Sequence, residues 1–184
     1  MKGLEATAVV AAILLLLAAA RIPLDVAYIR AGKLGLGLAI GAGGFGLFAV
    51  LAVLQARPMG ILRATNLRLL PWILLFVFAN AFMEELWLRA LFLRPLVSIA
   101  GPVVGVLLTA VVFAGIHIGA TYLSRGERLR FVAILFPLGL AWGASLHFTD
   151  SLIASTLFHA GADLMIVNGF IASFSGGTPV PSET

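Results

Sequence analysis

Two adjacent carboxylates interrupt an otherwise apolar part of the chain. Residues 80–94 read NAFMEELWLRALFLR, and the chain on both sides of this stretch is almost wholly apolar. Glu85 and Arg89 are four residues apart, so they can form an ion pair along one face of a helix. Glu84 lies about 100° round the helix from Glu85 and does not face that arginine. One carboxylate is therefore neutralised locally, and the other needs a partner or a chemical task elsewhere.

Ionisable side chains also occur within two later apolar segments. The sequence FAGIHIG carries His117, and LFHAGADLM carries His159 and Asp163, which are four residues apart and share a helix face. A charged side chain at the centre of a membrane helix costs roughly 2.5–3.5 kcal/mol, so such groups face the interior of a bundle and pair there. Together with Glu84, these residues predict a polar site inside an apolar protein.

The composition indicates an integral membrane protein. Of 184 residues, 61% are hydrophobic and only 11% are charged, whereas soluble domains carry about 25% charged residues. The mean hydropathy is +1.11. The net charge of +4 does not indicate a nucleic-acid partner, because most basic residues lie in loops between apolar spans. The absence of cysteine excludes disulfides, thiolate metal sites and a cysteine nucleophile.

The elements that position the site are predicted to be membrane helices. A bilayer core of about 30 Å requires roughly 20 apolar residues in helical form, and no alternating barrel pattern is present. We expect an all-α bundle of about six transmembrane helices with a buried polar active site. The expected spans are about Leu4–Ile22, Leu34–Leu54, Leu69–Leu93, Val103–Leu123, Phe131–Phe148 and Ser151–Phe174. The first span has features of a signal peptide, but Glu5 favours a retained helix.

The chain is expected to divide into three parts. Residues 1–68 hold two N-terminal transmembrane helices, residues 69–174 hold a catalytic core of four helices, and residues 175–184 form a disordered tail rich in Gly, Pro and Ser.

The polar residues can lie at a similar depth in the membrane. Glu84 and His117 are equally far in sequence from the segment IAGP, Ile99–Pro102, where Gly-Pro signals a turn. Pro95 is expected to break the first of these helices earlier, which leaves a short interfacial piece. His159 lies about nine residues from the turn near Asp150, roughly 14 Å at the helical rise. All three motifs can therefore reach the middle third of the bilayer.

The basic residues predict the orientation. With six helices, one side of the membrane would hold Lys2, Arg57, Arg63, Arg68, Arg125, Arg128 and Arg130, and the other side would hold Arg21, Arg30, Lys33 and Arg94. Cytoplasmic loops carry the excess of Lys and Arg. We therefore expect a multi-pass protein of the cell membrane with both termini in the cytoplasm.

Three short motifs resemble those of a known family. EELWLR matches E-E-x-x-x-R, FAGIH matches F-x-x-x-H, and HAGAD matches H-x-x-x-N/D, in this order. They resemble the CPBP family, which comprises type II CAAX prenyl endopeptidases and bacteriocin-processing or immunity-associated intramembrane proteases. The resemblance covers about Leu69 to Phe174. It implies an intramembrane endopeptidase acting on a membrane peptide or protein substrate, either prenylated or bearing a leader.

The resemblance also implies roles for individual residues. Glu84 and His117 look like the pair that activates a water molecule, and His159 and Asp163 look like the polar pair facing the scissile carbonyl. Glu85 and Arg89 look like a supporting ion pair. Peptide hydrolysis agrees with these residue types, because it needs a base for the water and hydrogen-bond donors for the developing oxyanion.

Asp163 departs from the family pattern, because many relatives have Asn at this position. An ionised carboxylate cannot donate a hydrogen bond to an oxyanion. Asp163 is therefore protonated, orients His159 or ligates a metal. Two histidines and a carboxylate, here Glu84, His117 and His159, form a plausible zinc set with one open position. We favour metal-free glutamate/histidine catalysis.

A non-enzymatic function is the alternative to protease activity. The same fold could serve as a membrane scaffold, an immunity protein or a small transporter, because intramembrane carboxylates and histidines also build proton relays.

Overall fold

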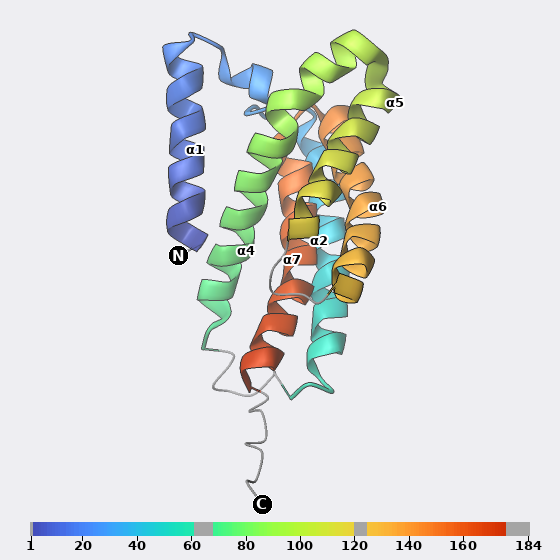
Figure 1. Ribbon diagram of the computed structural model, residues 1–184. Helices are drawn as coiled ribbons and strands as arrows, with labels where there is room; N and C mark the ends of the chain where they lie inside the picture. The colour runs from blue at the N-terminus through green and yellow to red at the C-terminus, as the bar shows by residue number, and fades with distance from the viewer. Residues whose placement is uncertain (1, 61–67, 120–124, 176–184) are drawn as a thin grey trace, which may run out of the picture.

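The computed structural model describes residues 2–60, 68–119 and 125–175, and within them it contains helices and no strand. This confirms the predicted all-α class. The elements, drawn in Figure 1, are α1 (Lys2–Ala19), a 3-10 turn (Leu24–Ala27), α2 (Leu34–Ala56), α4 (Leu70–Glu84), a π-helical turn (Glu85–Ala90), α5 (Leu91–Ile116), a 3-10 turn (His117–Gly119), α6 (Arg125–Thr149) and α7 (Leu152–Ser175). Apart from Ser175, the tail predicted to be disordered lies outside the described residues.

The number of membrane spans differs from the six predicted. In the described ranges, the helices long and apolar enough to cross a bilayer are Leu34–Ala56, Leu70–Gly119, Gly126–Thr149 and Leu152–Gly169. Gly3–Ala19 is apolar but shorter. Two predicted spans belong to the single segment Leu70–Gly119, because helical structure continues on both sides of its bend. The protein is thus a multi-pass membrane protein. The number of its membrane spans depends on whether the bent segment Leu70–Gly119 is counted as one span or as two.

Gly101 makes the bend within α5. Its φ of 84° and ψ of 166° are non-helical, and a positive φ suits glycine because it lacks a Cβ. Figure 1 shows the chain ascending through α4 to this bend and returning through the second half of α5. The predicted turn at Gly101-Pro102 is therefore present. The predicted break at Pro95 is wrong, because the helix runs through this residue, and the Ser98 hydroxyl donates to the Pro95 carbonyl at 2.8 Å.

Helix α7 lies at the centre of the bundle. It packs against α2, α4 and α6, while the returning half of α5 packs against α6. The approach of α2 to α7 depends on small residues: a Cβ at Gly161 would lie 2.6 Å from the Phe45 Cα, and one at Gly41 would lie 2.8 Å from the Leu157 Cβ. Because α7 is enclosed on three sides, its polar side chains are kept away from lipid.

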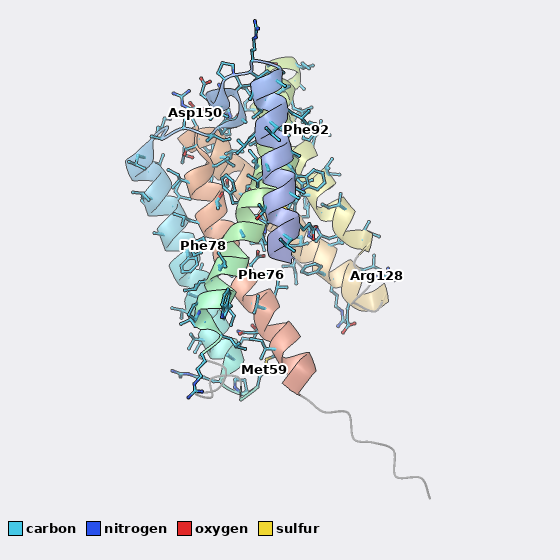
Figure 2. All side chains as sticks on the ribbon, turned by 90° about the vertical axis from the view of Figure 1, so that its left-hand side faces the viewer. Met59, Phe76, Phe78, Phe92, Arg128 and Asp150 are labelled. Atoms are coloured by element: carbon cyan, nitrogen blue, oxygen red, sulfur yellow. The ribbon has the colours of Figure 1, made fainter. Side chains whose placement is uncertain are left out.

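Helix α1 covers only one side of the bundle. Ile13 and Leu17 pack in a buried cluster with Leu86 and Ala90 of the π-helical turn. Figures 1 and 2 both show the N-terminal end of α1 beside the middle of α4, well short of the far end of α4. The first half of α4 therefore extends beyond the cover of α1.

A group of charged residues closes the end of the bundle that holds the bend. Asp150 accepts from Arg94 at 2.7 Å and pairs with Arg30 at 3.1 Å. The Arg94 guanidinium also lies over the ring of Tyr28, 4.6 Å from its centroid. We call Arg30, Arg94 and Asp150 the end clamp. It joins the α1–α2 connection and the start of α5 to the α6–α7 turn.

Candidate active site

The two adjacent glutamates lie where α4 changes its hydrogen-bond pattern. Glu84 is the last residue of α4 and Glu85 opens the π-helical turn. Glu85 and Arg89 form the predicted ion pair, and both side chains are fully buried. Single π-helical turns inside α-helices often mark functional sites. This irregularity was not predicted, because it depends on packing rather than on any residue type in the turn.

Glu85 has a second partner on α7. Its Oε1 lies 2.8 Å from Nδ1 of His159, and both side chains are buried. The Arg89 guanidinium is in turn covered by aromatic rings, with its Cζ 4.1 Å from the centroid of Phe113 and 5.2 Å from that of Trp142. Cations over aromatic faces are stabilised, and more so when desolvated. Glu85 therefore links the ion pair to the histidine, which sequence reasoning did not anticipate.

His159 is held in one orientation by its neighbours. Its ring stacks on Trp142 with centroids 4.0 Å apart and planes at 11°, and it meets Phe113 edge-on at 5.4 Å. Because Nδ1 faces Glu85, Nε2 is turned toward the other carboxylates. It lies 3.8 Å from Glu84 Oε2 and 3.5 Å from Asp163 Oδ1. Trp142 was missed from sequence, because an aromatic residue in an apolar span gives no signal of its own.

Asp163 bridges α7 and α4. One oxygen faces His159, and the other, Oδ2, accepts a hydrogen bond from Asn80 Nδ2 at 3.1 Å. Asp163 is buried and Asn80 is partly buried. Asn80 and Glu84 are four residues apart on α4 and therefore lie on the same face. The four residues Asn80, Glu84, His159 and Asp163 form a compact polar cluster between the two helices.

His117 lies beside this cluster rather than in it. It begins the 3-10 turn after α5, and its Nδ1 is 2.7 Å from the Phe113 carbonyl oxygen. Its ring packs on Phe113, with centroids 4.8 Å apart, so His117 and His159 contact the same phenyl ring. Among the described residues, no hydrogen bond or ion pair joins His117 to Glu84.

Glu84, His117 and His159 could hold a zinc ion only if their side chains converged on one point. In ranges 2–60, 68–119 and 125–175, no group of three or more His, Cys, Asp or Glu side chains is arranged to hold a metal ion. One nitrogen of His159 is engaged by Glu85, and Nδ1 of His117 is engaged by the Phe113 carbonyl oxygen. Glu84, His117 and His159 therefore do not form a three-ligand set in this arrangement.

The structure thus places a cluster of Glu, His and Asp side chains inside an apolar bundle of helices. Residues 66–165 match the family described as type II CAAX prenyl endopeptidase Rce1-like. This is more than half of the chain, and the protein belongs to that family of intramembrane proteases. The match begins just before α4 and ends within α7, so α1 and α2 lie outside it. No curated protein and no solved structure matches the chain.

Proposed function

We propose that the protein is an endopeptidase in which Glu84 activates a water molecule for attack on a peptide bond of a membrane-associated substrate. The observation that carries this proposal is the separation of 3.8 Å between Glu84 Oε2 and His159 Nε2. This gap is too long for a direct hydrogen bond, and a water can bridge two polar atoms at such a distance. Glu84 keeps 15% of its side chain exposed, so a water has a way in.

The steps follow from the positions of the groups. The Glu84 carboxylate takes a proton from the water, and the water oxygen forms a bond to the substrate carbonyl carbon. The carbonyl oxygen becomes an oxyanion. Doubly protonated, His159 donates Nδ1–H to Glu85 and directs Nε2–H toward that oxyanion. The C–N bond then breaks, and the leaving nitrogen receives the proton held by Glu84.

The other residues support these two groups. Arg89 balances the charge of Glu85 so that Glu85 can hold His159, and Trp142 limits rotation of the imidazole ring. We propose that His117 orients the attacking water. Donation of its Nδ1–H to the Phe113 carbonyl leaves Nε2 as an acceptor. In this proposal a peptide bond is cleaved without a metal ion.

The test is cleavage of a farnesylated peptide ending in a C-a-a-X sequence by the purified protein in detergent. We expect Glu84→Gln to lower kcat by about 10²–10⁴, the range for loss of a general base. Thermal unfolding should stay close to that of the wild type, because Gln keeps the shape of the side chain. Release of the C-terminal tripeptide is measured by mass spectrometry.

The control is Glu127→Gln, the same change at an exposed residue of α6. It should leave cleavage unchanged. Wild-type activity in folded Glu84→Gln would refute the role of Glu84. Loss of wild-type activity on adding a chelator, with recovery on adding zinc, would refute the metal-free chemistry.

A further inference from the structure

Two cationic side chains share one oxygen atom in the buried cluster. Arg89 Nη1 and His159 Nδ1 both contact Glu85 Oε1. With His159 doubly protonated, as in the proposed function, two like charges lie close together against a single carboxylate oxygen, and their repulsion is strong where the dielectric constant is low. Glu84 and Asp163 face the other nitrogen of His159, Nε2, so they do not separate the two cations. Any further stabilisation of this pair must come from another side chain.

The ring of Trp142 contacts both cations. The imidazole of His159 stacks on it, with centroids 4.0 Å apart and planes at 11°, and Arg89 Cζ lies over it at 5.2 Å from the centroid. An aromatic face carries negative potential and attracts a cation within about 6 Å, more strongly when the pair is desolvated. Trp142 is 1% exposed, and the rings of Phe113 and Phe158 meet it edge-on at 5.5 and 6.3 Å. Both contacts are therefore shielded from solvent.

A neutral ring suits this position better than a further carboxylate. The proposed reaction builds negative charge on the carbonyl oxygen beside His159 Nε2. Another carboxylate would repel that oxyanion, whereas an indole stabilises the two cations without adding net charge. Within the described parts of the chain the indole N–H meets no hydrogen-bond acceptor, so the contacts of Trp142 are those of its ring.

We infer that Trp142 is a positioning residue that stabilises the positive charges of Arg89 and His159 through one shared ring. This role is separate from the restraint on ring rotation, which an apolar side chain of similar size could also supply. The effect on cleavage rests on the proposed function, because Trp142 acts on the reaction only through the charged form of His159. The effect on the two cations requires no substrate and can be measured without one.

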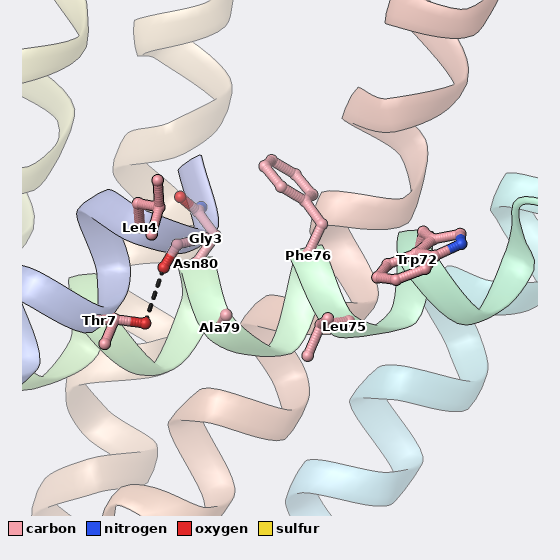
Figure 3. Close-up of a pocket in the computed structure, with 8 residues that line it drawn as sticks. All are labelled: Gly3, Leu4, Thr7, Trp72, Leu75, Phe76, Ala79 and Asn80. Atoms are coloured by element: carbon pink, nitrogen blue, oxygen red, sulfur yellow. Dashed lines mark hydrogen bonds between the residues drawn. The ribbon is translucent and has the colours of Figure 1, made fainter. Parts of the chain in front are cut away.

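Fluorinated tryptophan tests this role, because fluorine withdraws electron density from the ring face and changes the size of the ring little. The chain has three tryptophans, and Trp72 and Trp87 are exposed. Replacing these two by Phe lets biosynthetic incorporation place mono-, di- or trifluorotryptophan at Trp142 alone. The control is Trp142→Phe, which takes up the label only at the exposed positions. Of these, Trp72 is about 12 Å along α4 from Asn80, and Figure 3 shows the two well separated on the helix.

The first measurement is thermal unfolding in detergent, followed by circular dichroism. We expect the midpoint to fall with each added fluorine, because the ring then stabilises Arg89 and His159 less well. In His159→Gln one of the two cations is absent, so the fall across the series should be smaller, and the Trp142→Phe control should show none. A midpoint that does not depend on fluorine would overturn the shared ring. Equal falls with and without His159 would overturn its part in the inference.

The second measurement is cleavage of the farnesylated peptide. We expect kcat/KM to fall about ten-fold across the fluorine series, which corresponds to about 1.4 kcal/mol, a value in the range of desolvated cation–π contacts. Trp142→Leu should lose more activity than Trp142→Phe, because leucine fills space without an aromatic face. A midpoint that falls with fluorine in a protein that cleaves no peptide would refute the proposed function and keep the shared ring. Cleavage that is independent of fluorine while the midpoint falls would overturn the catalytic part of the inference.

Discussion

Asp163 divides its two oxygens between two partners. One oxygen faces Nε2 of His159 at 3.5 Å, and the other accepts from Asn80 at 3.1 Å. Because Asn80 supplies a donor, that oxygen acts as an acceptor and needs no proton. Of the three roles that the sequence leaves open for Asp163, we propose the orientation of His159, which these two contacts support.

Exchanging the two side chains tests this role. We expect Asp163→Asn to lower kcat, because a neutral amide stabilises a charged His159 less well. The double variant Asn80→Asp, Asp163→Asn should regain part of the activity, since it returns a carboxylate to the same hydrogen bond. A coupling of about 1–2 kcal/mol, or roughly five- to thirty-fold in kcat, is expected from a double-mutant cycle. Cleavage is measured for the four proteins over a range of pH.

Two outcomes would contradict this account. Full activity in Asp163→Asn, with loss of an alkaline decline that the wild type shows, would mean that the protonated carboxyl acts as a donor. Loss of both activity and a bound metal in the same variant would mean that Asp163 is a ligand.

At the residue scale, the sequence predicted the pairs that follow from helical spacing. Glu85 and Arg89 form their ion pair because residues four apart meet on a helix. The contact of Glu85 with His159 and the stacking of His159 on Trp142 could not be predicted. They join distant helices, and their formation depends on the relative rotation of those helices, which no local pattern encodes.

At the scale of elements, the close approach of α2 to α7 helps to position the polar cluster. Gly161 lies on α7 between His159 and Asp163, and its missing side chain allows the Phe45 backbone to come close. Small residues at helix interfaces permit this approach in membranes. The glycines of α2 differ in role: Gly41 faces α7 closely, whereas Gly43 has open space. Composition indicates close packing but does not identify which glycines provide it.

Gly161→Ala should therefore disturb both stability and activity. The added methyl group would overlap the Phe45 backbone, and overpacking of this kind typically costs about 1–3 kcal/mol. We expect a lower midpoint of thermal unfolding in detergent and a lower kcat, because α7 carries both His159 and Asp163. Gly43→Ala is the control and should match the wild type in both measurements. Unchanged stability in Gly161→Ala would show that α7 can shift without cost.

At the scale of the whole molecule, the end clamp defines one face of the membrane domain. Arg30 and Arg94 both pair with Asp150 there. The sequence predicts the same grouping, because it assigns both arginines to the side of the membrane with fewer basic residues. The prediction that both termini are cytoplasmic puts this end outside the cytoplasm. The number of spans could not be read from apolar runs alone, because the bend at Gly101 joins two of them in one helical segment.

Orientation can be tested without background labelling, because the chain has no cysteine. Lys33→Cys and Arg57→Cys place exposed thiols at opposite ends of α2. We expect a membrane-impermeant maleimide to label Lys33→Cys in intact cells and Arg57→Cys only after the membrane is opened. The reverse pattern would invert the topology. Thermal unfolding of both variants checks that each remains folded.

The π-helical turn also sets how insertions and deletions act on this protein. It lies on one continuous helical limb, after Glu84 and before Arg94. Removing one residue between Leu86 and Leu88 would let the turn close as an ordinary α-helix, because a π-helical turn holds one residue more than the α-helical turn that replaces it. The helix beyond it would keep nearly the same rotation, and Arg94 would still face Asp150. The same deletion in an ordinary α-helical turn rotates everything beyond it by about 100° and draws it back by about 1.5 Å, so this turn is the place where the limb can lose one residue and keep both distant contacts in phase.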